Sequence, residues 1–399
     1  MKKILMGMLL AALLLSGCSG CAKKSAEAAA VPPARVQIGV VLIDAEDAAA
    51  SEAQREGVEQ ALESLGMQDT QVVWRFEAGE EQELLEALQD CVDAGCNLIF
   101  TNPHTGRQRP VEQAAQSNPE TEFVAVGGDT AKTSGLANLH NMSPRLFEAQ
   151  YVAGIAAGLK LQELAGNGEL DGGDAEEDVS RLGYVAAFPN AEAISAYTAY
   201  FLGARSVCEE LTMTVRYLNA WQSDTAEYEA ANALLDAGCV VLGSDAASGV
   251  ALACSERRED GANVFCAADL NAAQAKWPSV YAELIDAFRT GKTLPTDWSA
   301  GFDRDAVGLT QTGDAAAVGT ADAQKTAIDG LKDGSLQIFA TDAFTVDGKT
   351  AASAFVTDTD GDLIADQDEA IYDGAFHECV FRSAPYFTLH IDGITEAFD

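Results

Sequence analysis

"DAGCNLIFTN", at residues 93–102, returns almost letter for letter as "DAGCVVLGSD" at residues 236–245. In both copies Asp-Ala-Gly closes a helical pattern and the chain turns directly into an apolar run, which is the pattern of the second half of a βαβ unit. The repeat therefore predicts two α/β lobes built on one plan. Each copy is expected to form the third strand of its lobe together with the helix before it.

The sequence around the two copies alternates apolar strands with amphipathic helices. The first lobe is predicted to have strands at residues 36–43, 71–76, 97–100 and 122–128, with helices at 48–65, 80–94 and up to about 118. A long helix at 144–164 leads into the second lobe, with strands at 181–188, 213–218, 240–243 and 263–268 and helices at 191–207 and 225–237. Uninterrupted apolar strands alternating with helices are typical of a doubly wound parallel sheet, so the predicted fold class is α/β.

The N-terminal segment has the pattern of a bacterial export signal. Lys2 and Lys3 precede an apolar run at residues 4–15, which is shorter than the roughly 20 residues that a membrane-spanning helix needs. The letters "LLLSGC" at its end resemble a bacterial lipobox, which implies cleavage before Cys18 and a diacylglycerol on its thiol. The polar, alanine-rich segment that follows is typical of a tether. We therefore expect an extracytoplasmic protein, lipid-anchored on the outer face of the cytoplasmic membrane.

The charge balance excludes one class of partner. Lys and Arg total 25 against 62 Asp and Glu, which gives a formal net charge of -37. Such a charge repels phosphate backbones and anionic lipid headgroups, so no nucleic-acid polymer is expected as a partner. We interpret the acidic surface as one that keeps a secreted protein soluble.

Eight cysteines follow Cys18, and most of them are expected to be buried as small apolar residues. They form no CxxC pair among themselves and have no histidine cluster beside them, so a zinc site is not expected. Cys254 and Cys266 are the one pair considered for a disulfide, which the extracytoplasmic compartment allows.

Residues just past the predicted strand ends are the candidates for ligand binding. In open parallel sheets, ligands bind beyond the carboxyl ends of the strands, and two facing lobes would form a cleft there. These residues carry mainly oxygen acceptors and aromatic rings, which suit a ligand with hydroxyls, N–H groups and a flat ring rather than a phosphate. They are Asp44, Asp47, Asn102–His104, Gly127–Asp129, Phe188–Asn190, Trp221–Asp224, Asp245 and Asp269.

Four stretches resemble a known family. "LGYVAAFPNAEAISAYTAYFLGARSV" (182–207), "WQSDTAEYEAANALLDAGCVVL" (221–242), "EAQYVAGIAAG" (148–158) and "LHNM" (139–142) are similar to the basic membrane protein family of substrate-binding lipoproteins, which serve ATP-driven nucleoside importers. The resemblance implies a type I periplasmic-binding-protein fold, with two doubly wound lobes joined by a hinge. It also implies a nucleoside or nucleobase ligand, purines above all, and a membrane permease as partner. A monomer is expected.

The resemblance carries over to single residues only where the motifs match. Phe188 lies in the "AAFP" turn, where the family places a side chain that faces the ligand, and Trp221 and Asp224 lie in a "W-x-x-D" turn. Phe188 or Trp221 would stack on the base. Asp245 or Asp269 would accept hydroxyl protons from the ribose.

The first loop departs from the family, because Ala50 stands where an aromatic residue is usual. Whether lobe 1 supplies a stacking ring therefore stays open. The candidate ligand-binding residues of lobe 1 are Asp47, Asn102 and His104.

The predicted division of the chain has five parts. They are a signal peptide at 1–17, a tether at 18–35, lobe 1 at 36–143 completed by about 275–310, lobe 2 at 144–270 completed by about 311–340, and a C-terminal extension at 341–399.

The extension contains an acidic stretch, "DTDGDLIADQDE", at residues 358–369. Five of its carboxylates, Asp358, Asp360, Asp362, Asp366 and Glu369, fall at positions 1, 3, 5, 9 and 12 of a calcium-loop register. The sixth position is Leu363, where the sharp turn of such a loop requires glycine. The stretch fits either a weak Ca²⁺ site or a solvated acidic turn, and no other cofactor is expected.

Three classes of function make different demands on the sequence. A binding protein that presents its ligand to a permease requires no chemistry, and the fold and strand-end residues favour it. An enzyme, such as a secreted nucleoside hydrolase, requires a nucleophile or metal constellation, and no G-x-S-x-G motif is present. A ligand sensor or a sugar-binding protein of the same fold remains the alternative.

Overall fold

The computed structural model describes most of the chain after the tether. The described residues are 32–33, 35–68, 70–103, 108–170, 180–221, 223–245, 248–356 and 366–397. No helix within these ranges combines the length and the apolar character that crossing a membrane requires. The predicted signal peptide and Cys18 lie outside the described residues.

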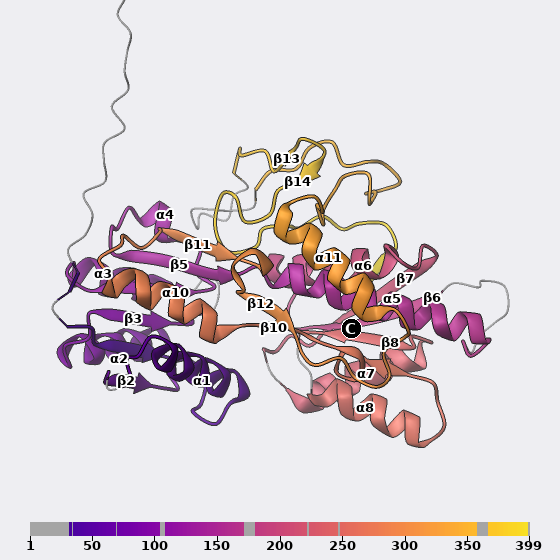
Figure 1. Ribbon diagram of the computed structural model, residues 1–399, viewed down its shortest axis with the longest axis horizontal. Coiled ribbons are helices and arrows are strands. Elements are labelled where there is room, and N and C mark those ends of the chain that lie inside the picture. Colours follow the sequence, from indigo (N-terminus) through magenta and orange to yellow (C-terminus); the bar gives the residue numbers. More distant parts are fainter. Residues whose placement is uncertain are drawn as a thin grey trace, which may run out of the picture.

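Lobe 1 is built on a six-stranded sheet in the order β11-β5-β4-β3-β1-β2, with every neighbouring pair parallel (Figure 1). Two elements from later in the chain, α10 and β11, complete it, and α10 packs on α1. The elements are β1 (Ile38–Val41), α1 (Ala49–Ser64), β2 (Val72–Arg75), α2 (Glu81–Asp93), β3 (Leu98–Thr101), α3 (Arg109–Ser117), β4 (Glu122–Val126), α4 (Ala131–Ser134), β5 (Leu139–Pro144), α10 (Trp277–Arg289) and β11 (Asp297–Ala300).

Lobe 2 is built on a five-stranded parallel sheet in the order β15-β7-β6-β8-β9. Its edge strand β15 comes from the C-terminal extension, so the division expected at residue 341 needs an amendment: the last strand belongs to lobe 2. The elements are α5 (Leu146–Asn167), β6 (Ser180–Ala186), α6 (Ala191–Arg205), β7 (Leu211–Tyr217), α7 (Asp224–Asp236), β8 (Val241–Ser244), α8 (Ser248–Glu259), β9 (Phe265–Cys266), α9 (Ala267–Leu270), α11 (Thr320–Asp333) and β15 (Ile394–Ala397).

The repeated phrase occupies equivalent places in the two lobes, as predicted. One copy joins α2 to β3, which pairs with β1 and β4; the other joins α7 to β8, which pairs with β6 and β9. In each copy the glycine ends the helix in a left-handed conformation, with φ of 88° at Gly95 and 85° at Gly238. This conformation suits glycine because the residue has no Cβ.

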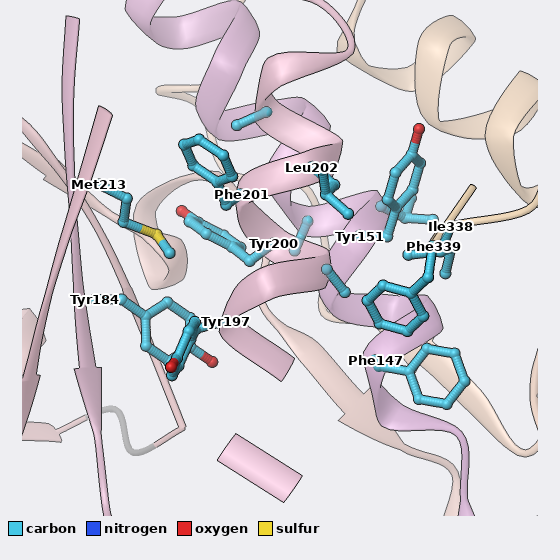
Figure 2. Close-up of a cluster of buried hydrophobic side chains, with 14 of the residues drawn as sticks. Phe147, Tyr151, Tyr184, Tyr197, Tyr200, Phe201, Leu202, Met213, Ile338 and Phe339 are labelled. Carbon is cyan, nitrogen blue, oxygen red and sulfur yellow. The ribbon is translucent and has the colours of Figure 1, made fainter. Parts of the chain in front are cut away.

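Helices α5 and α6 form the centre of lobe 2 and touch backbone to backbone. A Cβ added at Gly154 would lie 2.0 Å from the carbonyl oxygen of Tyr200, and one at Gly203 would lie 1.9 Å from that of Tyr151. Figure 2 shows Tyr200 pointing from α6 toward the sheet that carries Met213, with Tyr151 on the far side of the same helix pair. Glycine at the contact therefore sets how closely the two helices approach.

Three connections link the lobes, and each leaves a sheet at the carboxyl end of a strand. They run from β5 into α5, from β9 through α9 and β10 (Ala273–Ala275) into α10, and from β11 through η1 (Phe302–Arg304) into β12 (Val307–Leu309). Strands β10 and β12 pair antiparallel between the lobes (Figure 1). Because the crossovers start at the strand ends, those ends face the space between the lobes. We call this strand-end surface the interlobe face.

The C-terminal extension is attached to both lobes. Its small hairpin of β13 (Ile371–Tyr372) and β14 (Ala375–Phe376) leads into residues 378–387. There the carboxylate of Glu378 accepts a hydrogen bond from the Ser195 hydroxyl of α6 at 3.1 Å, and the backbone N–H of Ser383 donates to Asp297 of β11 at 3.0 Å. The extension thus provides a noncovalent link between the lobes beside the three covalent ones.

Candidate ligand-binding site

An aromatic pair marks the interlobe face of lobe 2. Phe188 follows β6 and Trp221 follows β7, and their ring centroids lie 4.7 Å apart with an interplanar angle of 58°. The turn that carries Phe188 is fixed because Asn190 caps α6, accepting a hydrogen bond from the Ala193 N–H at 2.9 Å. Trp221 remains 39% exposed, so a flat ligand can reach an aromatic surface at this place.

Asp245 follows β8 on the same face. Its Oδ1 accepts a hydrogen bond from the Tyr184 hydroxyl at 2.6 Å, and solvent also reaches the carboxylate. The protein around it removes part of its hydration and raises the pKa of Asp245 to about 7, with the negative charge of Glu192 adding to the shift. The group is therefore an oxygen acceptor whose charge changes near neutral pH.

A second polar cluster lies at the end of β7 and was not predicted from the sequence. The hydroxyls of Tyr197 and Tyr217 lie 3.2 Å apart, and both donate to Glu396, the Tyr217 hydroxyl at 3.0 Å. The His390 ring nitrogen lies 3.0 Å from the same carboxylate oxygen. Glu396 arrives on β15, nearly 180 residues after Tyr217, so no local spacing could have indicated this cluster.

Two of the predicted residues of lobe 2 make structural contacts. Asp224 begins α7 and accepts a hydrogen bond from Ser248 of α8 at 2.6 Å. Asp269 receives both guanidinium nitrogens of Arg258, at 2.7 and 2.9 Å, and the Cys266 N–H at 2.9 Å. The oxygens of Asp269 thus hold an ion pair and a helix cap, and its role as a ribose acceptor stays a prediction.

The predicted residues of lobe 1 are spread along its strand ends. Asn102 Oδ1 accepts a hydrogen bond from the Ile43 N–H at 3.0 Å and so holds the loop after β1. Asp47 is exposed and lines an open cavity of about 640 Å³ together with Glu46 and Phe76. His104 lies outside the described residues.

Asp129, past the end of β4, is held from two directions. Gln108 Nε2 donates to its Oδ1 at 2.6 Å, and Arg382 Nη1 of the extension lies 3.5 Å from its Oδ2. The Arg382 side chain is 8% exposed, and it also donates to the backbone carbonyls of Ala384 and Pro385, at 3.3 and 3.1 Å. The sequence could not indicate this contact because the two residues are 253 positions apart.

The acidic stretch of the extension is described only at its end. Asp358, Asp360 and Asp362 lie outside the described residues. Glu369, which would be the bidentate ligand of a calcium loop, has its oxygens taken by Ser353 at 2.5 Å, by the Ala354 N–H at 2.7 Å and by the Ile371 N–H at 3.0 Å. Among the described residues there is no group of three or more potential metal-ligating acids, histidines or cysteines.

Two α/β lobes with parallel sheets, three crossovers and strand ends turned toward each other define a hinged, two-lobed ligand-binding protein. The chain belongs to the family of PnrA-like ABC transporter substrate-binding proteins, whose pattern it matches over residues 39–276. Substrate-binding proteins of this kind work outside the cytoplasm, where they bind a small ligand and deliver it to a permease. The family consists of transport proteins and not of enzymes.

Two curated proteins are similar to part of the chain, and one solved structure shares its fold. A putative ABC transporter glucose-binding protein from Haloferax volcanii is 34% identical over 35% of this chain and 31% of its own length. A purine-binding protein from Brucella abortus is 29% identical over 37% of each chain. The chain thus spans about a third of the length of these curated relatives. The solved structure of an ABC transporter solute-binding protein from Aeropyrum pernix is similar with a TM-score of 0.61 and 13% identity, over 80% of this chain and 94% of that one.

Proposed function

We propose that the protein binds a nucleoside or nucleobase, with purines as the expected class, on the interlobe face and delivers it to the permease of an ABC importer. The lipid anchor at Cys18 would hold it, as a monomer, on the outer face of the membrane. The observation that carries the ligand class is the pairing of the Phe188 and Trp221 rings at 4.7 Å beside the carboxylate of Asp245.

The chemistry of this arrangement favours an uncharged, hydrogen-bonding ring. An aromatic surface stacks on a flat base, and such a contact contributes about 1–3 kcal/mol per base. The Asp245 carboxylate accepts hydrogen bonds from ribose hydroxyls or ring N–H groups. Glu192 places a second negative charge close to Asp245, which opposes a ligand that carries a phosphate.

A thermal-shift screen tests the proposal. Adenosine, guanosine, inosine, their free bases, D-glucose and AMP are added separately to the protein, because a ligand at a hundred times its Kd adds about 2.7 kcal/mol of stability. We expect one or more purine nucleosides or bases to raise the melting temperature and AMP to leave it unchanged. Phe188→Ala and Trp221→Ala should abolish the shift. Tyr372→Ala, which truncates an exposed ring outside the site, should retain it.

A sugar ligand is the second candidate, and the relative named as a glucose-binding protein favours it. Hydroxyl-rich sugars suit carboxylate acceptors and stack an apolar face on aromatic rings, so the same residues could serve. A shift with D-glucose but with no nucleoside or base would replace the first proposal by the second.

A further inference from the structure

The repeated phrase places two cysteines together at the end of α2. Gly95 N–H donates to the Val92 carbonyl at 2.8 Å, and Cys96 N–H donates to the Cys91 carbonyl at 3.0 Å. This pair of bonds is a Schellman motif, which brings the side chain two residues past the helix into contact with one in its last turn. In lobe 1 both of these side chains, at positions 91 and 96, are cysteines.

The geometry at this site is within reach of a disulfide. A nitrogen-to-oxygen distance of 3.0 Å between the two residues limits their Cα atoms to a separation of about 7 Å at most, and disulfides span about 4.4–6.8 Å. Cys91 and Cys96 are 0% and 3% exposed, and the neighbouring thiol raises the pKa of Cys91 and lowers that of Cys96. Both residues belong to the same buried core cluster of lobe 1.

Lobe 2 contains a second pair, from different elements. Cys254 lies on α8 and Cys266 ends β9, which packs against α8, and the neighbouring thiol raises the pKa of Cys254 and lowers that of Cys266. Both are buried in the core cluster between these elements, at 0% and 3% exposure. The Cys266 thiol also lies 3.2 Å from Asp269, whose carboxylate keeps its two bonds to Arg258 if that proton is lost.

We infer that the exported protein carries two disulfides, Cys91–Cys96 in lobe 1 and Cys254–Cys266 in lobe 2. Each forms when one thiolate attacks a disulfide-bearing oxidant to give a mixed disulfide, and the second thiolate then displaces the oxidant as its dithiol. Two thiol protons and two electrons leave the protein, and one S–S bond forms. Because all four sulfurs are buried, the exchange takes place during folding. The inference depends on the extracytoplasmic location and not on the identity of the ligand.

The other copy of the repeat supplies an internal control. There the same motif places Cys239 against Leu234, with a Cys239 N–H to Leu234 carbonyl distance of 3.0 Å. The Cys239 thiol instead donates to the Leu182 carbonyl at 3.3 Å. Cys239 shares the position and burial of Cys96 but has a leucine where lobe 1 has its second thiol, so it should stay reduced.

The test is a thiol map of the full chain exported by a bacterial host. The protein is denatured in N-ethylmaleimide without reductant and digested with a protease that cleaves before Asp, which separates the members of both pairs at Asp93 and Asp260. We expect two linked peptide pairs, one for each lobe, and a maleimide-modified Cys239. Cys91→Ser should free Cys96 for modification while leaving the bond in lobe 2 intact, and Cys254→Ser should do the reverse.

A melting curve adds a second measurement. Reduction of the wild-type protein should lower its melting temperature by at least about 3 °C, whereas the Cys239→Ser variant should show the same loss on reduction as wild type. Complete maleimide modification of all four cysteines in the exported protein, or linkage to other cysteines, would overturn the inference. One linked pair without the other would overturn it for the lobe that lacks the bond.

Discussion

The contact between α5 and α6 predicts a loss of stability whose size can be estimated from the structure. In Gly154→Ala the new Cβ would lie 2.0 Å from the Tyr200 carbonyl oxygen, against about 3.3 Å for a close carbon-to-oxygen contact. The missing distance of about 1.3 Å cannot be relieved by a rotamer change, because the obstructing atom is backbone. The two helices have to separate or tilt.

The expected cost follows from this geometry. Overpacking a core costs about 1–3 kcal/mol, and a rigid obstacle places this case at the upper end. Alanine regains about 0.5–1 kcal/mol through its higher helix propensity. We therefore expect the free energy of unfolding to fall by about 2 kcal/mol, measured as a lower urea midpoint at an unchanged slope.

The same helix offers a matched control. Gly166 also lies in α5, but no atom lies within 4 Å of a Cβ built on it, so Gly166→Ala should be neutral or stabilise by about 0.5 kcal/mol. Gly203→Ala, from the α6 side of the contact, should be as damaging as Gly154→Ala. A Gly154→Ala protein as stable as the Gly166→Ala protein would show that the helices do not approach as closely as described.

Three further predictions concern the site and the extension. If the ligand donates to the carboxylate of Asp245, the affinity of the protein for the ligand should fall by up to about tenfold from pH 8 to pH 6. The reason is that protonation below the raised pKa of about 7 removes the negative charge of the acceptor. Calorimetry should show this pH dependence for the wild-type protein and not for Asp245→Asn. Arg382→Gln should weaken ligand binding and lower the melting temperature, because Asp129 loses its cation, whereas the exposed Lys325→Gln should change neither. Titration of Ca²⁺ into chelator-treated protein should release no heat at millimolar ion, since the oxygens of Glu369 are already engaged. A saturable heat would instead support the calcium site.

How much of this structure the sequence predicts depends on how far apart in the chain the interacting residues are. The repeat with its glycines, four strands of each lobe and the positions of Phe188 and Trp221 after two of these strands follow from local patterns, because helix ends and apolar runs are recognisable within a few residues. Neither Glu396 nor Arg382 could be found this way, since each reaches its partner from the far end of the chain. The ion pair of Asp269 with Arg258 was not predicted either, although the two residues are only 11 positions apart, because a position at a strand end does not show which side chain of the preceding helix will reach it.

The close contact of α5 with α6 determines where closure of the two lobes around a ligand could be measured. Helix α5 starts two residues after β5 of lobe 1 ends, and α6 starts three residues after Phe188. Two helices in backbone contact move as a single rigid body. A rotation of α5 relative to lobe 1 at Pro144 therefore displaces α6 and Phe188 by the same rotation. A fluorophore pair spanning the start of α5 and an outer helix of lobe 1 would then follow ligand capture without any label near the ligand.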